Sequence, residues 1–155
     1  MASQEKYTKY AERIRIFNGL TPDEVEYVLH CGKSIHFHEG QTVFHEGMLG
    51  RNLFVVLSGK IAIYNKKRII AKCRVGDAFG EMAVLNQKPR SATAAALEDV
   101  KLFTLDEHEI NQILDKGVAV KLLLNIIHVL SERLEKANAS IARLRDEKSA
   151  FDGPQ

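Results

Sequence analysis

Hydrophobic positions along the chain change their spacing twice, and these changes divide it into a helical, an extended and a second helical part. In the first part, apolar residues recur every three or four positions, which is the period of one helix face. Thr21-Pro22-Asp23-Glu24 has the residues of a capping box, with the threonine at the N-cap and the glutamate reaching back to it. We therefore expect two short N-terminal helices, the second of which turns Val25, Val28 and Leu29 toward the core.

From about residue 35, the apolar residues gather in short extended runs that glycines separate. Glycine adopts positive φ without steric cost, so Gly40, Gly47, Gly59 and Gly76 are predicted to lie in turns. Many short strands with regular turn signals are typical of a sandwich or a barrel-like roll. One segment, residues 80–85, interrupts this rhythm and predicts a short helix. The predicted strands are Ile35–His38, Thr42–His45, Leu53–Leu57, Lys60–Tyr64, Arg68–Cys73, Ser91–Ala96 and Val100–Leu105.

After Leu105 the spacing becomes helical again, with an acidic cap at residues 106–109 and a break at Gly117. The long helix predicted over residues 118–148 keeps apolar residues in steps of three and four over four heptads, as in a coiled coil. We expect the roll to cover Val120 and Leu123, and the more distal positions to pair with a second copy in a parallel homodimer. The predicted dimer seam consists of Ile127, Leu130, Leu134, Ala137, Ile141 and Leu144.

Length and composition fit one soluble domain, because 155 residues that are 45% hydrophobic and 27% charged can bury a core. A formal net charge of +2 argues against a direct nucleic-acid partner. The two cysteines form no disulfide framework, and the N-terminus lacks the apolar core of a secretory signal. No apolar run is long enough to span a bilayer. We expect a cytoplasmic protein without a membrane partner.

The segment Phe79–Thr93 carries the most informative chemistry. A short helix that begins at Gly80 lets its free backbone N–H groups come close to a ligand, and such groups attract anions. Arg90 supplies a fixed positive fork suited to phosphate oxygens, and Ser91 adds a hydroxyl donor. Ionised Glu81 only accepts hydrogen bonds, so its natural partner is a hydroxyl or an amine. A ribose phosphate satisfies this set.

The two motifs FGEMAVL (Phe79–Leu85) and PRSAT (Pro89–Thr93) resemble the phosphate-binding cassette of cyclic nucleotide-binding domains, such as those of bacterial catabolite activators and cyclic-AMP-dependent kinase regulatory subunits. The resemblance covers roughly residues 12–145. It implies a mainly β fold, a β-roll of the jelly-roll type with N-terminal helices and a long C-terminal helix. The residue matching Glu81 holds the ribose 2′-hydroxyl, and the residue matching Arg90 holds the cyclic phosphate. The implied ligand-binding set is Gly80, Glu81, Met82, Ala83, Arg90, Ser91, Ala92 and Asn138.

The resemblance also places base recognition on the long helix. Aligned on Arg133-Leu134, the positions that reach the purine are Ala137 and Asn138, the latter from the partner subunit. Many relatives carry threonine where Ala137 stands, and this departure leaves the choice between adenine and guanine open. Cyclic AMP is favoured over cyclic GMP as the ligand.

The resemblance predicts a regulatory sensor that acts by ligand-induced conformational change, with no catalysis and no metal. The predicted domain spans residues 12–148, with an N-terminal extension over 1–11 and a disordered tail over 149–155. The chain stops soon after the long helix, so we expect no DNA-binding domain of its own and an unidentified downstream protein partner.

Three further interpretations remain. A ligand-free dimeric scaffold with the same fold, and a transcription regulator without its DNA-binding domain, both fit the pattern. A cupin-like metal-binding roll is suggested by His36 and His38, which alternate on one strand face as cupin ligands do. A cupin, however, requires a glutamate four or five residues beyond the second histidine, where this chain has Thr42 and Val43. We expect His36, His38 and His45 to be exposed strand residues.

Overall fold

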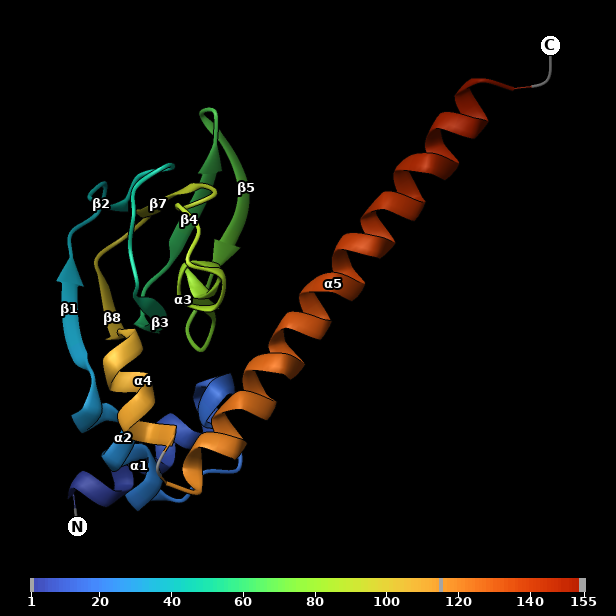
Figure 1. Cartoon of the computed structure of the whole chain (residues 1–155). Helices are drawn as coiled ribbons and strands as arrows, with labels where there is room; N and C mark the ends of the chain where they lie inside the picture. Colours follow the sequence, from blue (N-terminus) through green and yellow to red (C-terminus); the bar gives the residue numbers. More distant parts are fainter. Residues whose placement is uncertain (1, 115, 154–155) are drawn as a thin grey trace.

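The computed structural model describes residues 2–114 and 116–153, and it has the predicted β-roll between N-terminal helices and a long C-terminal helix (Figure 1). The strands are β1 (Lys33–Phe37), β2 (Thr42–Phe44), β3 (Leu53–Ser58), β4 (Ile61–Asn65), β5 (Arg68–Cys73), β6 (Ala78–Phe79), β7 (Thr93–Ala96) and β8 (Val100–Leu105). The helices are α1 (Ala2–Arg13), the 3₁₀ helix η1 (Arg15–Phe17), α2 (Pro22–Cys31), α3 (Glu81–Asn86), α4 (Glu107–Leu114) and α5 (Val118–Phe151).

The strands form two antiparallel sheets, which we call sheet A, in the order β1-β8-β3-β6, and sheet B, in the order β2-β7-β4-β5. All seven predicted strands are present, and their ends differ from the prediction by at most two residues. The two-residue strand β6 was not predicted. Helix α5 continues three residues beyond the predicted end at Lys148, so residues 149–151 are helical rather than disordered. Residues 154–155 of the predicted tail lie outside the described residues.

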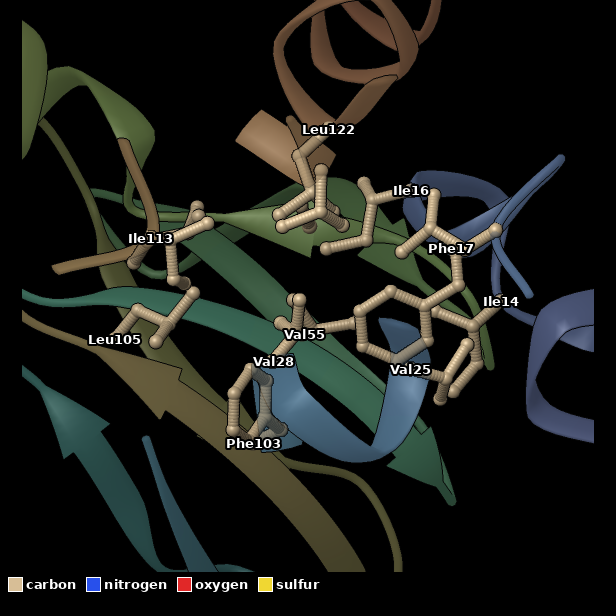
Figure 2. Packing of buried hydrophobic residues seen from close by; sticks show 14 of the residues in the cluster. Ile14, Ile16, Phe17, Val25, Val28, Val55, Phe103, Leu105, Ile113 and Leu122 are labelled. Atoms are coloured by element: carbon tan, nitrogen blue, oxygen red, sulfur yellow. The ribbon is translucent and has the colours of Figure 1, made fainter. Parts of the chain in front are cut away.

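Sheet A separates two hydrophobic layers, and this position explains the continuous apolar run of β3. Neighbouring strand residues point to opposite faces. Phe54 and Val56 therefore pack against sheet B, while Leu53, Val55 and Leu57 pack against the helices. Figure 2 shows the second layer, in which side chains from the helices converge on Val55, Phe103 and Leu105. The helical side chains labelled there are Ile16, Phe17, Val25, Val28, Ile113 and Leu122, and Ile14 joins them from the link between α1 and η1.

The N-terminal helices close one face of sheet A. The predicted capping box is present: the Glu24 amide donates to Thr21 Oγ1 at 3.2 Å, and the Thr21 amide donates to Glu24 Oε1 at 3.0 Å. Val25 and Val28 are fully buried. Tyr7 and Tyr10 of α1 pack against the same core, so residues before position 12 take part in it.

Helix α5 turns a different face to the roll from the one predicted. Its buried residues are Val118, Ala119, Leu122 and Val129, whereas Val120 is 62% exposed and Leu123 is 43% exposed. The expectation that the roll covers these two residues is wrong, because the face that packs on the roll lies beside the heptad seam. Of the predicted dimer seam, Ile127, Leu134, Ala137, Ile141 and Leu144 are exposed, whereas Leu130 is half-buried. In the part of the chain that the structure describes, no helix is both long and apolar enough to cross a membrane.

Polar contacts fix the N-terminal half of α5 to the helices before the roll. The Asn125 side-chain amide donates to the Ile16 carbonyl at 2.9 Å and to the Asn18 carbonyl at 2.7 Å. Lys121 Nζ donates to Glu24 Oε1 at 2.7 Å, and this hydrogen bond lowers the pKa of the Glu24 carboxyl. Asn125, which interrupts an apolar run in the sequence, is therefore an anchor of α5.

We predict that Asn125→Ala lowers the free energy of unfolding by about 1–3 kcal/mol, because it leaves the Ile16 and Asn18 carbonyls without their donor. Urea denaturation measures the change. Asn111→Ala, which alters an exposed asparagine of α4, is the matched control and should have little effect. Equal losses in the two variants would contradict the anchoring role.

Candidate functional site

A pocket of about 580 Å³ lies between the roll and α5. It is lined by β4, β5 and β6, by the segment that follows β6, and by residues 132–140 of α5. Five cationic residues and three anionic residues contribute to its wall, which favours an anionic ligand. Of the residues proposed from the sequence, the structure brings together in this pocket Gly80, Glu81, Arg90, Ser91 and Ala92.

The remaining proposed residues are placed differently. Helix α3 includes Met82 and Ala83, whose side chains lie outside the described part of the structure. Asn138 is exposed and does not line the pocket of its own chain. Its predicted contact is with the ligand of a partner subunit, which a single chain does not test.

Gly80 shapes the pocket through its missing side chain. It has φ of 76°, in the left-handed region, and it forms the N-cap of α3. A Cβ atom at this position would lie 2.6 Å from Arg90 Nη1. Gly50 has a similar role, because its Cβ would lie 2.8 Å from Arg90 Nη2. Both glycines therefore leave room for the guanidinium group.

Arg90 is buried and held from several sides. Its Nη1 donates to the Gly80 carbonyl at 2.9 Å, and its Nη2 donates to the Asn52 carbonyl at 3.0 Å. The Phe44 ring centroid lies 4.2 Å from Arg90 Cζ, within cation–π range. Arg90 is only 6% exposed, and these contacts fix the plane of its guanidinium group.

The charge of Arg90 has no counter-charge next to it. Among the described residues, no carboxylate lies within 4 Å of its guanidinium. Burial lowers the pKa of Arg90, although the Glu81 carboxylate nearby partly opposes this effect. A buried charge is costly unless an ion of opposite sign joins it. The site is therefore suited to an anion.

Glu81 connects the pocket to α5. Arg133 Nη1 donates to Glu81 Oε1 at 3.3 Å, and Arg133 Nη2 donates to the Ala78 carbonyl. The contact between Arg133 and Glu81 was not predicted from the sequence, where Arg133 served only to align the long helix. No local signal marks it, because the two partners of the ion pair are 52 positions apart.

Helix α5 supplies Lys136, Ala137 and Ser140 to the wall of the pocket. These residues lie on the same face of the helix as Arg133, at spacings of three, four and seven residues. Ala137 offers no hydrogen-bonding group, while the lysine and the serine beside it do. A planar ligand group that extends toward α5 would meet these polar side chains.

Cysteine and histidine side chains are the remaining candidates for nucleophilic or metal chemistry. Cys73 lines the pocket, but burial raises the pKa of its thiol to about 11, which keeps it protonated at neutral pH. His36, His38 and His45 are exposed, as predicted, but only His36 lies in a strand, because β1 ends at Phe37 and β2 ends at Phe44. In the described ranges 2–114 and 116–153, no three His, Cys, Asp or Glu residues are grouped to hold a metal ion.

Comparison with known proteins agrees with this chemistry. The family model described as "Cyclic nucleotide-binding domain" matches residues 34–116. The chain is 30% identical to the Cyclic AMP receptor protein of Thermus thermophilus, over 86% of this chain and 63% of that protein. It is 31% identical to a cAMP-dependent protein kinase regulatory subunit of Hypocrea atroviridis, over 73% of this chain and 24% of that protein. The chain thus spans less than two thirds of these relatives.

Solved structures show the same fold. The crystal structure of Thermus thermophilus catabolite activator protein matches with a TM-score of 0.74 and 29% identity, over 84% of this chain and 63% of that one. A cyclic nucleotide-binding domain from Methylobacillus flagellatus matches with a TM-score of 0.76 at 22% identity, which shows the fold alone. The family model covers more than half of the chain, including Gly80, Glu81 and Arg90, so the chain belongs to the cyclic nucleotide-binding domain family.

Proposed function

We propose that this protein binds a cyclic purine nucleotide, with cyclic AMP favoured over cyclic GMP, and changes conformation in response. The observation that carries the proposal is the buried guanidinium of Arg90, which lacks a carboxylate partner among the described residues. A cyclic phosphate would supply the missing negative charge. The protein performs no reaction on the ligand, and the binding unit comprises residues 12–148.

Each part of the nucleotide has a proposed partner in the pocket. The phosphate binds Arg90, Ser91 and the backbone amides that begin α3. The ribose 2′-hydroxyl donates to Glu81, whose side chain already faces the pocket. The remaining members of the set, carried over from the family resemblance, are Gly80, Met82, Ala83, Ala92 and, from the partner subunit, Asn138.

The Arg133 contact gives the ligand a route to α5. A ribose hydroxyl that donates to Glu81 changes the environment of the carboxylate that Arg133 now holds. A ligand shifts a conformational equilibrium only by its differential affinity for the two states. We infer that the position of α5 relative to α3 differs between the ligand-free and ligand-bound states.

The exposed seam of α5 supports a parallel homodimer. This 34-residue helix is about 50 Å long at 1.5 Å per residue, and Figure 1 shows its C-terminal half extending away from the roll. A heptad seam that is mostly exposed in the single chain is suited to a second copy of the same helix. A cytoplasmic location agrees with Cys31 and Cys73, both of which are free. The downstream protein partner stays unidentified.

Titration calorimetry with cyclic AMP and cyclic GMP tests the proposal directly. We predict that Arg90→Ala weakens binding by about 100-fold, because a desolvated phosphate loses its charged donor. Arg51→Lys, which changes an exposed arginine before β3, is the control and should bind like the unmodified protein. Unchanged affinity in Arg90→Ala would refute the phosphate site. No heat with either nucleotide, from an intact folded protein, would favour the ligand-free scaffold.

The role of Glu81 predicts a change in ribose discrimination rather than in phosphate binding. Glu81→Gln should reduce the preference for cyclic AMP over its 2′-deoxy analogue by about tenfold, since a neutral amide is a weaker acceptor than a carboxylate. Asp77→Asn alters another acidic residue of the pocket wall and serves as the control. If both variants prefer cyclic AMP over the 2′-deoxy analogue as strongly as the unmodified protein does, Glu81 does not hold the ribose.

The proposed dimer seam predicts that an added charge within it prevents dimerisation. Leu134→Asp and Ile141→Asp should convert the dimer to a monomer, because a charged residue in a coiled-coil seam is desolvated without a partner. Analytical ultracentrifugation measures the mass. Leu49→Asp, in an exposed loop away from α5, should leave the dimer intact. A protein that is monomeric before mutation contradicts the dimer.

A further inference from the structure

The β4–β5 hairpin carries a concentration of positive charge, of which only Lys72 also lines the nucleotide pocket. Residues 60–76 contain six lysine or arginine residues and no acidic residue, although the whole chain has a net charge of only +2. All six are exposed, and within the described residues none forms an ion pair. They are Lys60, Lys66, Lys67, Arg68, Lys72 and Arg74.

Apolar and aromatic side chains lie among these cations. Ile69 is 47% exposed and pairs across the hairpin with Tyr64, which is partly exposed. Ile70, beside it at a register shift, is 59% exposed and lines the pocket. The tip of the hairpin lies at the end of the roll opposite the N-terminal helices, where it projects freely (Figure 1). The surface therefore combines flexible cations with aliphatic and tyrosine side chains.

The two residues of the turn at this tip are not the residue types that stabilise its geometry best. Lys66 and Lys67 join Asn65 to Arg68, and their φ angles are 46° and 68°, both in the left-handed region. Two-residue turns with this geometry favour asparagine followed by glycine, because lysine in the left-handed region is strained. The strain agrees with a function for the two lysine side chains at the tip.

We propose that the β4–β5 hairpin binds the surface of an anionic lipid bilayer. Clusters of four to eight lysine or arginine residues attract anionic headgroups, and isoleucine and tyrosine are suited to the boundary between headgroups and acyl chains. The expectation of no membrane partner rested on the lack of a spanning segment, and a peripheral contact needs none. The inference does not depend on the nucleotide site.

Two other roles, protection of an exposed strand edge and nucleic-acid binding, each explain fewer features of this surface than membrane binding does. Lysines on the edge strand β5 protect it from pairing with other strands, but this role does not require lysines in a strained turn beyond the strand or an exposed Ile69. A nucleic-acid site is served by arginine guanidinium groups and stacking aromatic rings, whereas four of these six cations are lysines and the exposed apolar residues beside them include Ile69 and Ile70.

Vesicle co-sedimentation tests the proposal with the full chain. We expect it to sediment with phosphatidylcholine vesicles that contain about 30% phosphatidylserine, and not with pure phosphatidylcholine, with binding that weakens as salt rises. Lys66→Asn combined with Lys67→Gly should reduce binding about tenfold or more. The same double variant should keep or raise the midpoint of thermal unfolding, because it supplies the favoured turn residues.

A charge-matched control separates the hairpin from net charge. Lys33→Asn combined with Lys116→Asn removes two exposed lysines elsewhere and should leave vesicle binding nearly unchanged. The proposal is overturned if the protein does not sediment with phosphatidylserine vesicles. It is also overturned if the hairpin variant binds these vesicles like the unmodified protein, or if both double variants lose vesicle binding equally. Binding of duplex DNA without binding of the vesicles would likewise overturn it, in favour of a nucleic-acid surface.

Discussion

The buried charge of Arg90 is the constraint on which the rest of the site depends. A buried guanidinium needs either a carboxylate beside it or an anion brought by a ligand. The fold supplies two backbone carbonyls and an aromatic face, which satisfy donors and orient the fork but add no negative charge. The protein thus holds a rigid cation whose partner must come from outside the chain.

The residues around Arg90 leave room for its side chain and hold its backbone in place. Gly50 and Gly80 leave space that any Cβ atom would fill, and Gly80 also adopts the left-handed conformation that begins α3. The loop before β3 is tied to residue 90 in both directions: the Arg90 amide donates to the Met48 carbonyl at 2.9 Å, and the Gly47 amide donates to the Arg90 carbonyl at 2.8 Å. These contacts make the loop and the cassette one unit.

The sequence predicted those features whose signals are local. The capping box at Thr21, the strand runs and the pocket segment from Phe79 are each encoded by neighbouring residues. The ion pair between Arg133 and Glu81 could not be predicted in this way, because it depends on how α5 lies against the roll. The error at Val120 and Leu123 has the same origin: a heptad period defines a seam, but the choice between covering the roll and pairing outside depends on tertiary packing.

Helix α5 therefore has two faces with separate roles, and a single rigid element joins them. One face carries Arg133, Lys136 and the seam residue Ala137 toward the pocket, while Ile127, Leu134, Ile141 and Leu144 of the seam stay exposed in the single chain. If occupancy of the pocket alters the pose of this helix, the proposed dimer must respond, and pairing must in turn change nucleotide affinity by the same factor, since linkage between binding equilibria is reciprocal. Nucleotide affinity and oligomeric state would then both depend on the position of α5.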